Sequence, residues 1–186
     1  MGMPLTEHRF TVDEYHRMGD AGIFHDDDRV ELIDGRIVEM SPIGGRHVAC
    51  VIRLTNALAP LVGARGLVSG QNPLVLGRRS EPVPDVVVLR RRDDLSGAWL
   101  PAREDALLVI EVAETSLRYD RETKIGLYAE AGVPEVWLVN LLGDAVEIYS
   151  DPLEGGYRDI RTARRGETIA PLAFPDLRLP VAEILG

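Results

Sequence analysis

The segment ALLVIEVA, residues Ala106 to Ala113, decides the fold of this chain. Seven of its eight residues are apolar, and such a run without alternation is typical of a β-strand covered on both faces. We therefore expect it at the centre of a sheet. Its one polar residue, Glu111, would be costly to bury without a cation or hydrogen-bond donors beside it. Either such partners surround Glu111, or its side chain reaches water where the strand ends.

A second apolar strand is predicted at Val86 to Leu89, and Asp85 stands directly before it. If the two strands pair antiparallel with Arg90 opposite Ala106, Asp85 falls opposite Glu111 and the two carboxylates share one face. Carboxylates that close repel each other unless a divalent cation lies between them, and their oxygens suit Mg²⁺ or Mn²⁺. This register predicts a metal site, whereas a shift of one residue would separate the two side chains.

Lys124 is the only lysine among 21 basic residues. It falls in a helix predicted from Asp120 to Ala131, with Asp120 as N-cap and Gly132 just past the end. The start of this helix should lie near the end of the Glu111 strand. A lysine there suits orienting a water molecule or offsetting negative charge on a phosphate. The simpler alternative is an ion pair with Asp120, one helical turn earlier.

The N-terminal third predicts a helix and a hairpin. Thr11 and Glu14 have the spacing of a capping box, so a helix should cover Val12 to Met18. The Asp34-Gly35 pair favours a tight turn between two antiparallel strands. We expect those strands at Arg29 to Asp34 and at Arg36 to Met40.

The remaining pattern indicates an α/β or α+β fold, in which helices flank a mixed central β-sheet. After Pro42, apolar residues recur at helical spacing and predict a helix of about four turns that packs on the sheet through one stripe. The stripe consists of Val48, Val51, Ile52, Thr55 and Ala59. Further strands are expected at Pro73 to Leu76, Glu135 to Leu142 and Ala145 to Ser150, with short strand-like pieces around Tyr157 and Phe174.

Composition limits the class of protein. A length of 186 residues fits one domain, and we find neither a signal peptide nor a run of about 20 apolar residues. We expect a cytoplasmic protein without a membrane span, in which the single cysteine, Cys50, is buried and inert. A net charge of −9 argues against general coating of nucleic acid. Three arginine clusters either contact phosphates or are simply solvated: Arg78 and Arg79; Arg90, Arg91 and Arg92; Arg161, Arg164 and Arg165.

Several segments together resemble one family. They are VELIDG (Val30 to Gly35), Pro84-Asp85, Glu111-Val112 and YDRETKIGLYAEAGVPEVW (Tyr119 to Trp137), the last being the most specific. They resemble the Uma-two family of the PD-(D/E)xK, restriction-endonuclease-like superfamily, from about Phe10 to the C-terminus. The resemblance implies a single restriction-endonuclease-like domain over residues 1–186, with additional β-hairpins.

The resemblance also implies an activity. It predicts a Mg²⁺- or Mn²⁺-dependent endonuclease that hydrolyses phosphodiester bonds, with DNA as the expected substrate. Asp85 and Glu111 would hold the ion, and Lys124 would position the attacking water. The commonest superfamily pattern has its lysine two residues after the acid, where this chain has Ala113. The family pattern places the lysine on the helix instead, where Lys124 stands.

Two further residues are candidates for substrate binding. His47 belongs to the pattern of the resemblance and is expected near substrate or a metal-bound water, although a capping or packing histidine is an equal alternative. Gln71 could hold a carboxylate or phosphate, or could stabilise the turn before Asn72-Pro73.

The main alternative to an enzyme is a non-catalytic nucleic-acid-binding or interaction module that keeps the nuclease fold. The acidic net charge and Ala113 favour it, whereas the cluster of Asp85, Glu111 and Lys124 opposes it. A hydrolase of a small phosphorylated molecule is a third possibility. By analogy with enzymes that cut both strands of a duplex, we also expect a homodimer.

Overall fold

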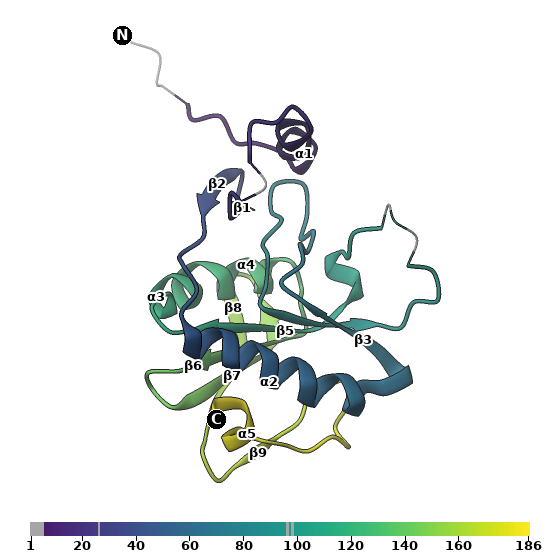
Figure 1. The fold of residues 1–186 in the computed structure, drawn as a ribbon, viewed down its shortest axis with the longest axis vertical. Helices are drawn as coiled ribbons and strands as arrows, with labels where there is room; N and C mark the ends of the chain where they lie inside the picture. Colours follow the sequence, from purple (N-terminus) through teal and green to yellow (C-terminus); the bar gives the residue numbers. More distant parts are fainter. Residues whose placement is uncertain (1–5, 26, 96, 98) are drawn as a thin grey trace.

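A computed structural model describes residues 6–25, 27–95, 97 and 99–186. Its centre is a six-stranded sheet in the order β3-β4-β5-β6-β7-β8, in which β5 and β6 run parallel and the other neighbours antiparallel. Figure 1 shows this mixed sheet with helices on either side. The strands are β3 (Gly66–Gly70), β4 (Val86–Arg90), β5 (Ala106–Ala113), β6 (Glu135–Asn140), β7 (Ala145–Leu153) and β8 (Gly156–Arg164).

Strand β5 has the bounds expected from its apolar run and lies between β4 and β6. Near the start of β4, the register between β4 and β5 is the expected one, because Val86 pairs with Ile110. At the other end a bulge shifts the register, so Leu89 rather than Arg90 pairs with Ala106. The expected pairing of Arg90 is therefore wrong, because β5 has an extra residue there. The bulge leaves the opposite end of the strand pair, where the site lies, unchanged.

Helix α2 (Gly45–Val62) packs on one face of the sheet, but only in part through the expected stripe, of which Val51 packs against the core. Val48 and Ile52 are 44% and 54% exposed. The helix carries apolar residues on most of its circumference, so periodicity alone cannot choose the buried side. Its core face is formed by Cys50, Leu54, Leu58 and Val62. By length and composition the segment Gly45–Arg65 could also cross a membrane, a test that core helices of soluble proteins pass as well.

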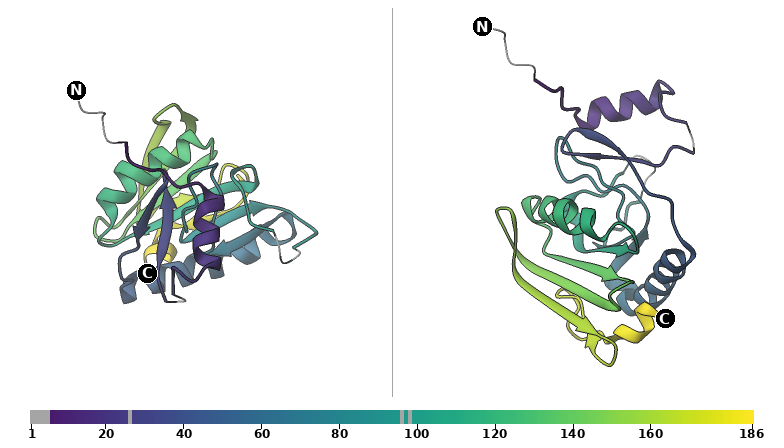
Figure 2. Two further views of the ribbon diagram at one scale, coloured as in Figure 1. Left: turned by 90° about the horizontal axis from the view of Figure 1, so that it is seen from above. Right: turned by 90° about the vertical axis from the view of Figure 1, so that its left-hand side faces the viewer.

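The other face of the sheet is covered by one continuous helical segment. It comprises α3 (Leu117–Tyr119), the π-helical η3 (Asp120–Lys124) and α4 (Ile125–Glu130). The helix therefore begins three residues before Asp120, and the prediction of Asp120 as N-cap is wrong. Its carboxylate instead accepts a 2.6 Å hydrogen bond from the Ser116 hydroxyl. Figure 2 shows this segment and α2 on opposite sides of the sheet.

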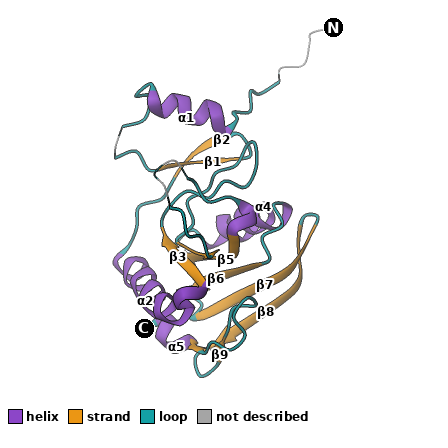
Figure 3. Ribbon diagram, turned by 90° about the vertical axis from the view of Figure 1, so that its right-hand side faces the viewer, coloured by secondary structure: helices purple, strands orange, loops and turns teal. Residues whose placement is uncertain are grey.

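The N-terminal elements form a cap beside the main sheet (Figure 3). Helix α1 (Val12–Asp20) has the predicted capping box and runs two residues further than expected. Strands β1 (Val30–Ile33) and β2 (Arg36–Glu39) form the predicted hairpin. The connection after β3 packs against this hairpin, because Leu32 and Glu81 exchange backbone hydrogen bonds. The cap thus brings β1 close to the segment that leads into β4.

Two strand predictions need correction. The segment around Val75 is not a strand and makes only an isolated bridge to Ala102, whereas β3 just before it was missed. Phe174 also lies outside any strand. Short helices η1 (Gly63–Arg65) and η2 (Arg103–Asp105) precede β3 and β5.

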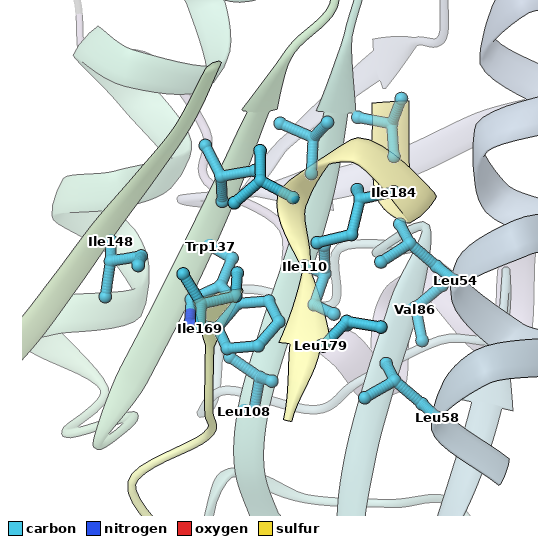
Figure 4. Close-up of a cluster of buried hydrophobic side chains, with 14 of the residues drawn as sticks. Leu54, Leu58, Val86, Leu108, Ile110, Trp137, Ile148, Ile169, Leu179 and Ile184 are labelled. Carbon is cyan, nitrogen blue, oxygen red and sulfur yellow. The ribbon is translucent and has the colours of Figure 1, made fainter. Parts of the chain in front are cut away.

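The C-terminal segment covers the α2 side of the sheet. It contains β9 (Thr168–Ile169), β10 (Leu179–Pro180) and α5 (Val181–Leu185). Figure 4 shows Ile169, Leu179 and Ile184 packed against side chains of the sheet and α2. Burial of this cluster fixes the strands whose ends carry the site.

Candidate active site

A cleft of about 690 Å³ lies where β4 begins and β5 ends. One wall is the connection from β2 into α2, and the other is the segment from Glu114 to Lys124. The cleft brings together the three residues expected to act, namely Asp85, Glu111 and Lys124. His47 also lines it.

Glu111 is 3% exposed, so the alternative that its side chain simply reaches water is wrong. Its Oε1 accepts a 2.6 Å hydrogen bond from the Tyr128 hydroxyl and lies 3.2 Å from Lys124 Nζ. Burial raises the pKa of Glu111 to about 8, with Lys124 opposing the shift and Asp85 adding to it. One ammonium is therefore insufficient to keep this carboxyl ionised at neutral pH.

Lys124 is 5% exposed and bridges two carboxylates. Its Nζ lies 3.0 Å from Glu31 Oε2 and 3.2 Å from Glu111 Oε1. Burial disfavours its charged form, but Glu111, Glu31 and Asp120 together raise the pKa of Lys124 above its ordinary value. The ammonium therefore stays protonated. Its contacts with Glu31 and Glu111 make the simpler reading, an ion pair with Asp120 alone, wrong.

Glu31, which simple alternation along the Arg29 to Asp34 strand would leave exposed, is a further charged residue of the site. It is 2% exposed, and its Oε2 also accepts a hydrogen bond from the Val83 backbone N–H at 3.2 Å. Alternation of buried and exposed residues does not predict the burial of Glu31, because β1 is buried at three consecutive residues, from Glu31 to Ile33. The available signal was its place in VELIDG, between two apolar residues.

Asp85 is 9% exposed and is held by three donors. Its Oδ2 accepts hydrogen bonds of 2.9 Å from the Val112 N–H and from His47 Nε2. Its Oδ1 accepts a longer bond, 3.4 Å, from the Gln71 side chain. The structure thus places both candidate substrate-binding residues against Asp85. The backbone of Gln71 is at a turn, with a φ of +52°, and its N–H donates to the Asp85 carbonyl. Its side-chain amide bonds to Asp85 and, among the described residues, makes no hydrogen bond within the turn, so the turn-stabilising role considered for that amide is not supported.

The family is decided by comparison with known sequences. The family model Uma2, described as "Putative restriction endonuclease", matches residues 12–182. This chain belongs to the Uma2 family. Among curated proteins, no sequence matches it.

Solved structures agree on the fold of this Uma2 protein. A crystal structure from Anabaena variabilis ATCC 29413, titled as a "putative nuclease belonging to DUF820", is similar with a TM-score of 0.74 and 15% identity, over 95% of this chain and 97% of that one. The type IIG restriction endonuclease BpuSI overlaps 60% of this chain and 13% of its own length, at 16% identity. Its TM-score of 0.38 adds nothing to the assignment. The chain has the restriction-endonuclease-like fold of a nuclease family.

Nucleases of this kind generally use divalent metal ions, and the donor chemistry of the cleft fits one. Three buried carboxylates, Glu31, Glu111 and Asp120, surround the single buried ammonium of Lys124, and the buried Asp85 lies near Glu111. In the described part of the chain, no three His, Cys, Asp or Glu side chains gather as a complete ligand set. Mg²⁺ does not require one, because it keeps several waters and binds through one or two carboxylates.

Two polar atoms in the cleft walls are buried without a hydrogen-bond partner. They are His47 Nδ1 and the Tyr119 hydroxyl, and in the described residues they are the two buried side-chain atoms in this state. Burial raises the pKa of Tyr119 to about 12, so its hydroxyl keeps its proton. Buried polar atoms are normally paired, so both are free to bond with water or ligand.

The arginine clusters singled out in the sequence do not line the cleft. Arg90 ends β4, at the opposite end of that strand from Asp85, and Arg165 pairs with Asp144. The arginines of the cleft are instead Arg29 and Arg118, both exposed. No sequence pattern indicated a role for these two arginines, because neither belongs to a cluster of basic residues.

Proposed function

We propose that this Uma2 protein is a divalent-metal-dependent endonuclease that hydrolyses phosphodiester bonds in DNA. The observation that carries the proposal is the convergence of Asp85 and Glu111 with the buried Lys124 ammonium in one cleft. Nuclease family membership supports the reaction class.

Asp85 and Glu111 would hold the metal ion, Mg²⁺ or Mn²⁺, through carboxylate oxygens. When bound, such an ion lowers the pKa of a water ligand and offsets negative charge on a phosphate. Asp85 enters this role already oriented, since the Val112 N–H and His47 fix its carboxylate. Glu111 would need the ion to stay ionised, because burial raises its pKa to about 8.

Lys124 supplies positive charge and does not accept a proton. Its pKa is raised, so it serves to stabilise negative charge on the phosphate and to orient water by donating hydrogen bonds. Glu31, which lies on β1, also pairs with this ammonium. A lysine held by two carboxylates loses little further freedom when substrate arrives.

His47, Arg29 and Arg118 are the proposed substrate contacts. The Nε2 of His47 donates to Asp85, which leaves Nδ1 free to accept from a water or substrate hydroxyl in the cleft. The two exposed arginines can pair with phosphates on either side of the cleavage point.

Nicking of supercoiled plasmid tests the proposal. Wild type should nick with Mg²⁺ or Mn²⁺ and stop on addition of EDTA, whereas Asp85→Ala should not nick. Asp176→Ala, which removes an exposed aspartate paired with Arg65, is the matched control and should behave as wild type. Metal-independent nicking, or equal nicking by Asp85→Ala, would overturn the proposal.

The non-catalytic module remains the second candidate, because the chain carries a net charge of −9. Its signature in the same experiment is DNA retardation in a gel without any nicked product, at every metal concentration. Release of inorganic phosphate from a small phosphomonoester, with plasmid intact, would instead indicate the small-molecule hydrolase.

A further inference from the structure

We infer that the Tyr119 hydroxyl is a substrate contact, which donates a hydrogen bond to a nonbridging oxygen of the phosphate beside the Lys124 ammonium. Tyr119 lines the cleft but has no part in the metal ligation or charge stabilisation proposed above. The inference stands on the pairing of the hydroxyl, on the geometry of its helix and on the charges around it. The identity of the substrate, a phosphodiester, rests on the function proposed above.

The Tyr119 hydroxyl differs from the hydroxyls of the other four tyrosines of the chain. Each of those donates a hydrogen bond of 2.6–3.1 Å to a carbonyl or carboxylate oxygen. They are Tyr15, Tyr128, Tyr149 and Tyr157. The Tyr119 hydroxyl is buried and has no hydrogen-bond partner in the part of the chain that the structure describes. A buried hydroxyl left unpaired costs free energy of folding, so a fold that leaves one in a cleft wall keeps it available to a ligand.

The helix that carries Tyr119 places its side chain beside Lys124. Helix α3 ends at Tyr119 and the π-helical η3 follows, in which the Ile125 N–H donates to the Asp120 carbonyl five residues back. Residues five apart point about 140° away from each other in an α-helix, whereas the wider π turn stacks them on one side. Tyr119 and Lys124 are five residues apart, and both line the cleft. The π turn thus gives the cleft a hydroxyl and an ammonium from one helix.

The surroundings of the Tyr119 hydroxyl select an oxygen anion as its ligand. Burial raises the pKa of Tyr119 to about 12, so the hydroxyl keeps its proton and can donate. An ammonium has three N–H donors, and Glu31 and Glu111 lie within reach of two of those on Lys124. The third N–H and the Tyr119 hydroxyl can together hold one phosphate oxygen. A metal ion at the same point would be repelled by the ammonium, which leaves an anion as the fitting ligand.

Urea unfolding in EDTA tests whether the hydroxyl is unpaired in the free protein. Tyr119→Phe should unfold at the same urea concentration as wild type or a higher one, because it removes a hydroxyl that has no partner. Tyr157→Phe is the matched control and should unfold at a lower concentration, since its hydroxyl donates a 2.8 Å hydrogen bond to the Val133 carbonyl. An equal fall in both variants would show that the Tyr119 hydroxyl has a structural partner and would overturn the inference.

Calorimetric titration with inorganic phosphate tests binding without cleavage. Mg²⁺ is included because the cleft is rich in carboxylates. Wild type and Tyr157→Phe should bind phosphate with equal affinity. Tyr119→Phe should bind it about tenfold more weakly, because it lacks a hydrogen bond to a charged group. The inference fails if wild type binds no phosphate, or if Tyr119→Phe binds it as tightly as wild type.

Cleavage of a labelled DNA duplex tests the contact in the reaction. At saturating DNA and Mg²⁺, Tyr119→Phe should cut roughly 10²-fold more slowly than wild type, as expected when one donor to a developing charge is removed. Tyr157→Phe should cut at the wild-type rate, and an equal rate for Tyr119→Phe would contradict the contact. If wild type cuts no DNA, the proposed function fails, while the phosphate titration still decides whether Tyr119 binds a phosphate.

Discussion

The single ammonium of Lys124 does not balance the negative charge of the carboxyl groups buried around it. The lysine shares its charge between Glu111 and Glu31, and Asp85 and Asp120 add further negative charge nearby. The sequence predicted that Asp85, Glu111 and Lys124 would meet, because β-strand register and chain order confine all three to one end of the sheet. It could not place Glu31, since the fold of the cap, rather than local alternation, buries that residue.

Substitution of Lys124 separates charge from position. Lys124→Met leaves the buried Glu31 without its cation and should destabilise the protein by about 3–5 kcal/mol in urea unfolding. Lys124→Arg keeps the charge but not the compact ammonium, so it should fold and cleave roughly 10²-fold more slowly. Full cleavage by Lys124→Arg would show that charge alone suffices and would contradict the positioning role.

Glu111 predicts a pH dependence of stability in metal-free protein. The native carboxyl holds its proton up to about pH 8, whereas the unfolded one loses it near 4.5. Between these values the native state binds more protons, so stability falls as pH rises. In EDTA, wild type should lose on the order of 4 kcal/mol relative to Glu111→Gln between pH 5 and 9. Parallel urea-unfolding profiles for the two proteins would refute the shifted pKa.

At the scale of elements, the hairpin β1-β2 matters because it carries Glu31 to Lys124. Its turn was predictable from Asp34-Gly35, and both residues have positive φ as expected. The packing side of α2 was not predictable, because the helix is apolar on two sides. The start of the α3-η3-α4 segment was also missed, since Ser116 rather than Asp120 precedes the helix.

Gly35→Ala tests the hairpin. Gly35 has φ +71°, and an added Cβ would lie 2.7 Å from the Arg9 Cβ and 3.0 Å from its backbone. The change should cost more than about 1 kcal/mol in stability and lower cleavage by displacing Glu31. Gly155→Ala, at φ +80° with open space around it, carries the backbone penalty without the clash. Equal cleavage losses in the two variants would rule out a specific role for the hairpin.

At the scale of the whole molecule, the fold places an acidic cleft within an acidic protein. The mixed sheet and the central position of β5 could be predicted from the apolar runs in the sequence. Long apolar segments are buried whichever residues they contact. How the cap packs beside the site, and which side of α2 faces solvent, depend on contacts between segments far apart in the sequence. No local sequence pattern encodes such contacts. The site is therefore a property of the assembled fold, in which cap, sheet and helix all supply charged groups to the cleft.

Single-turnover cleavage of a labelled DNA duplex at saturating Mg²⁺ tests the central claim most directly, using two buried glutamates. Glu111→Gln should slow cleavage roughly 10²–10³-fold. Glu135→Gln should cleave at the wild-type rate, because Glu135, 1% exposed on β6, bonds Trp137 and Leu172 away from the cleft. Equal rates for Glu111→Gln and Glu135→Gln would contradict a catalytic metal centre at Asp85 and Glu111.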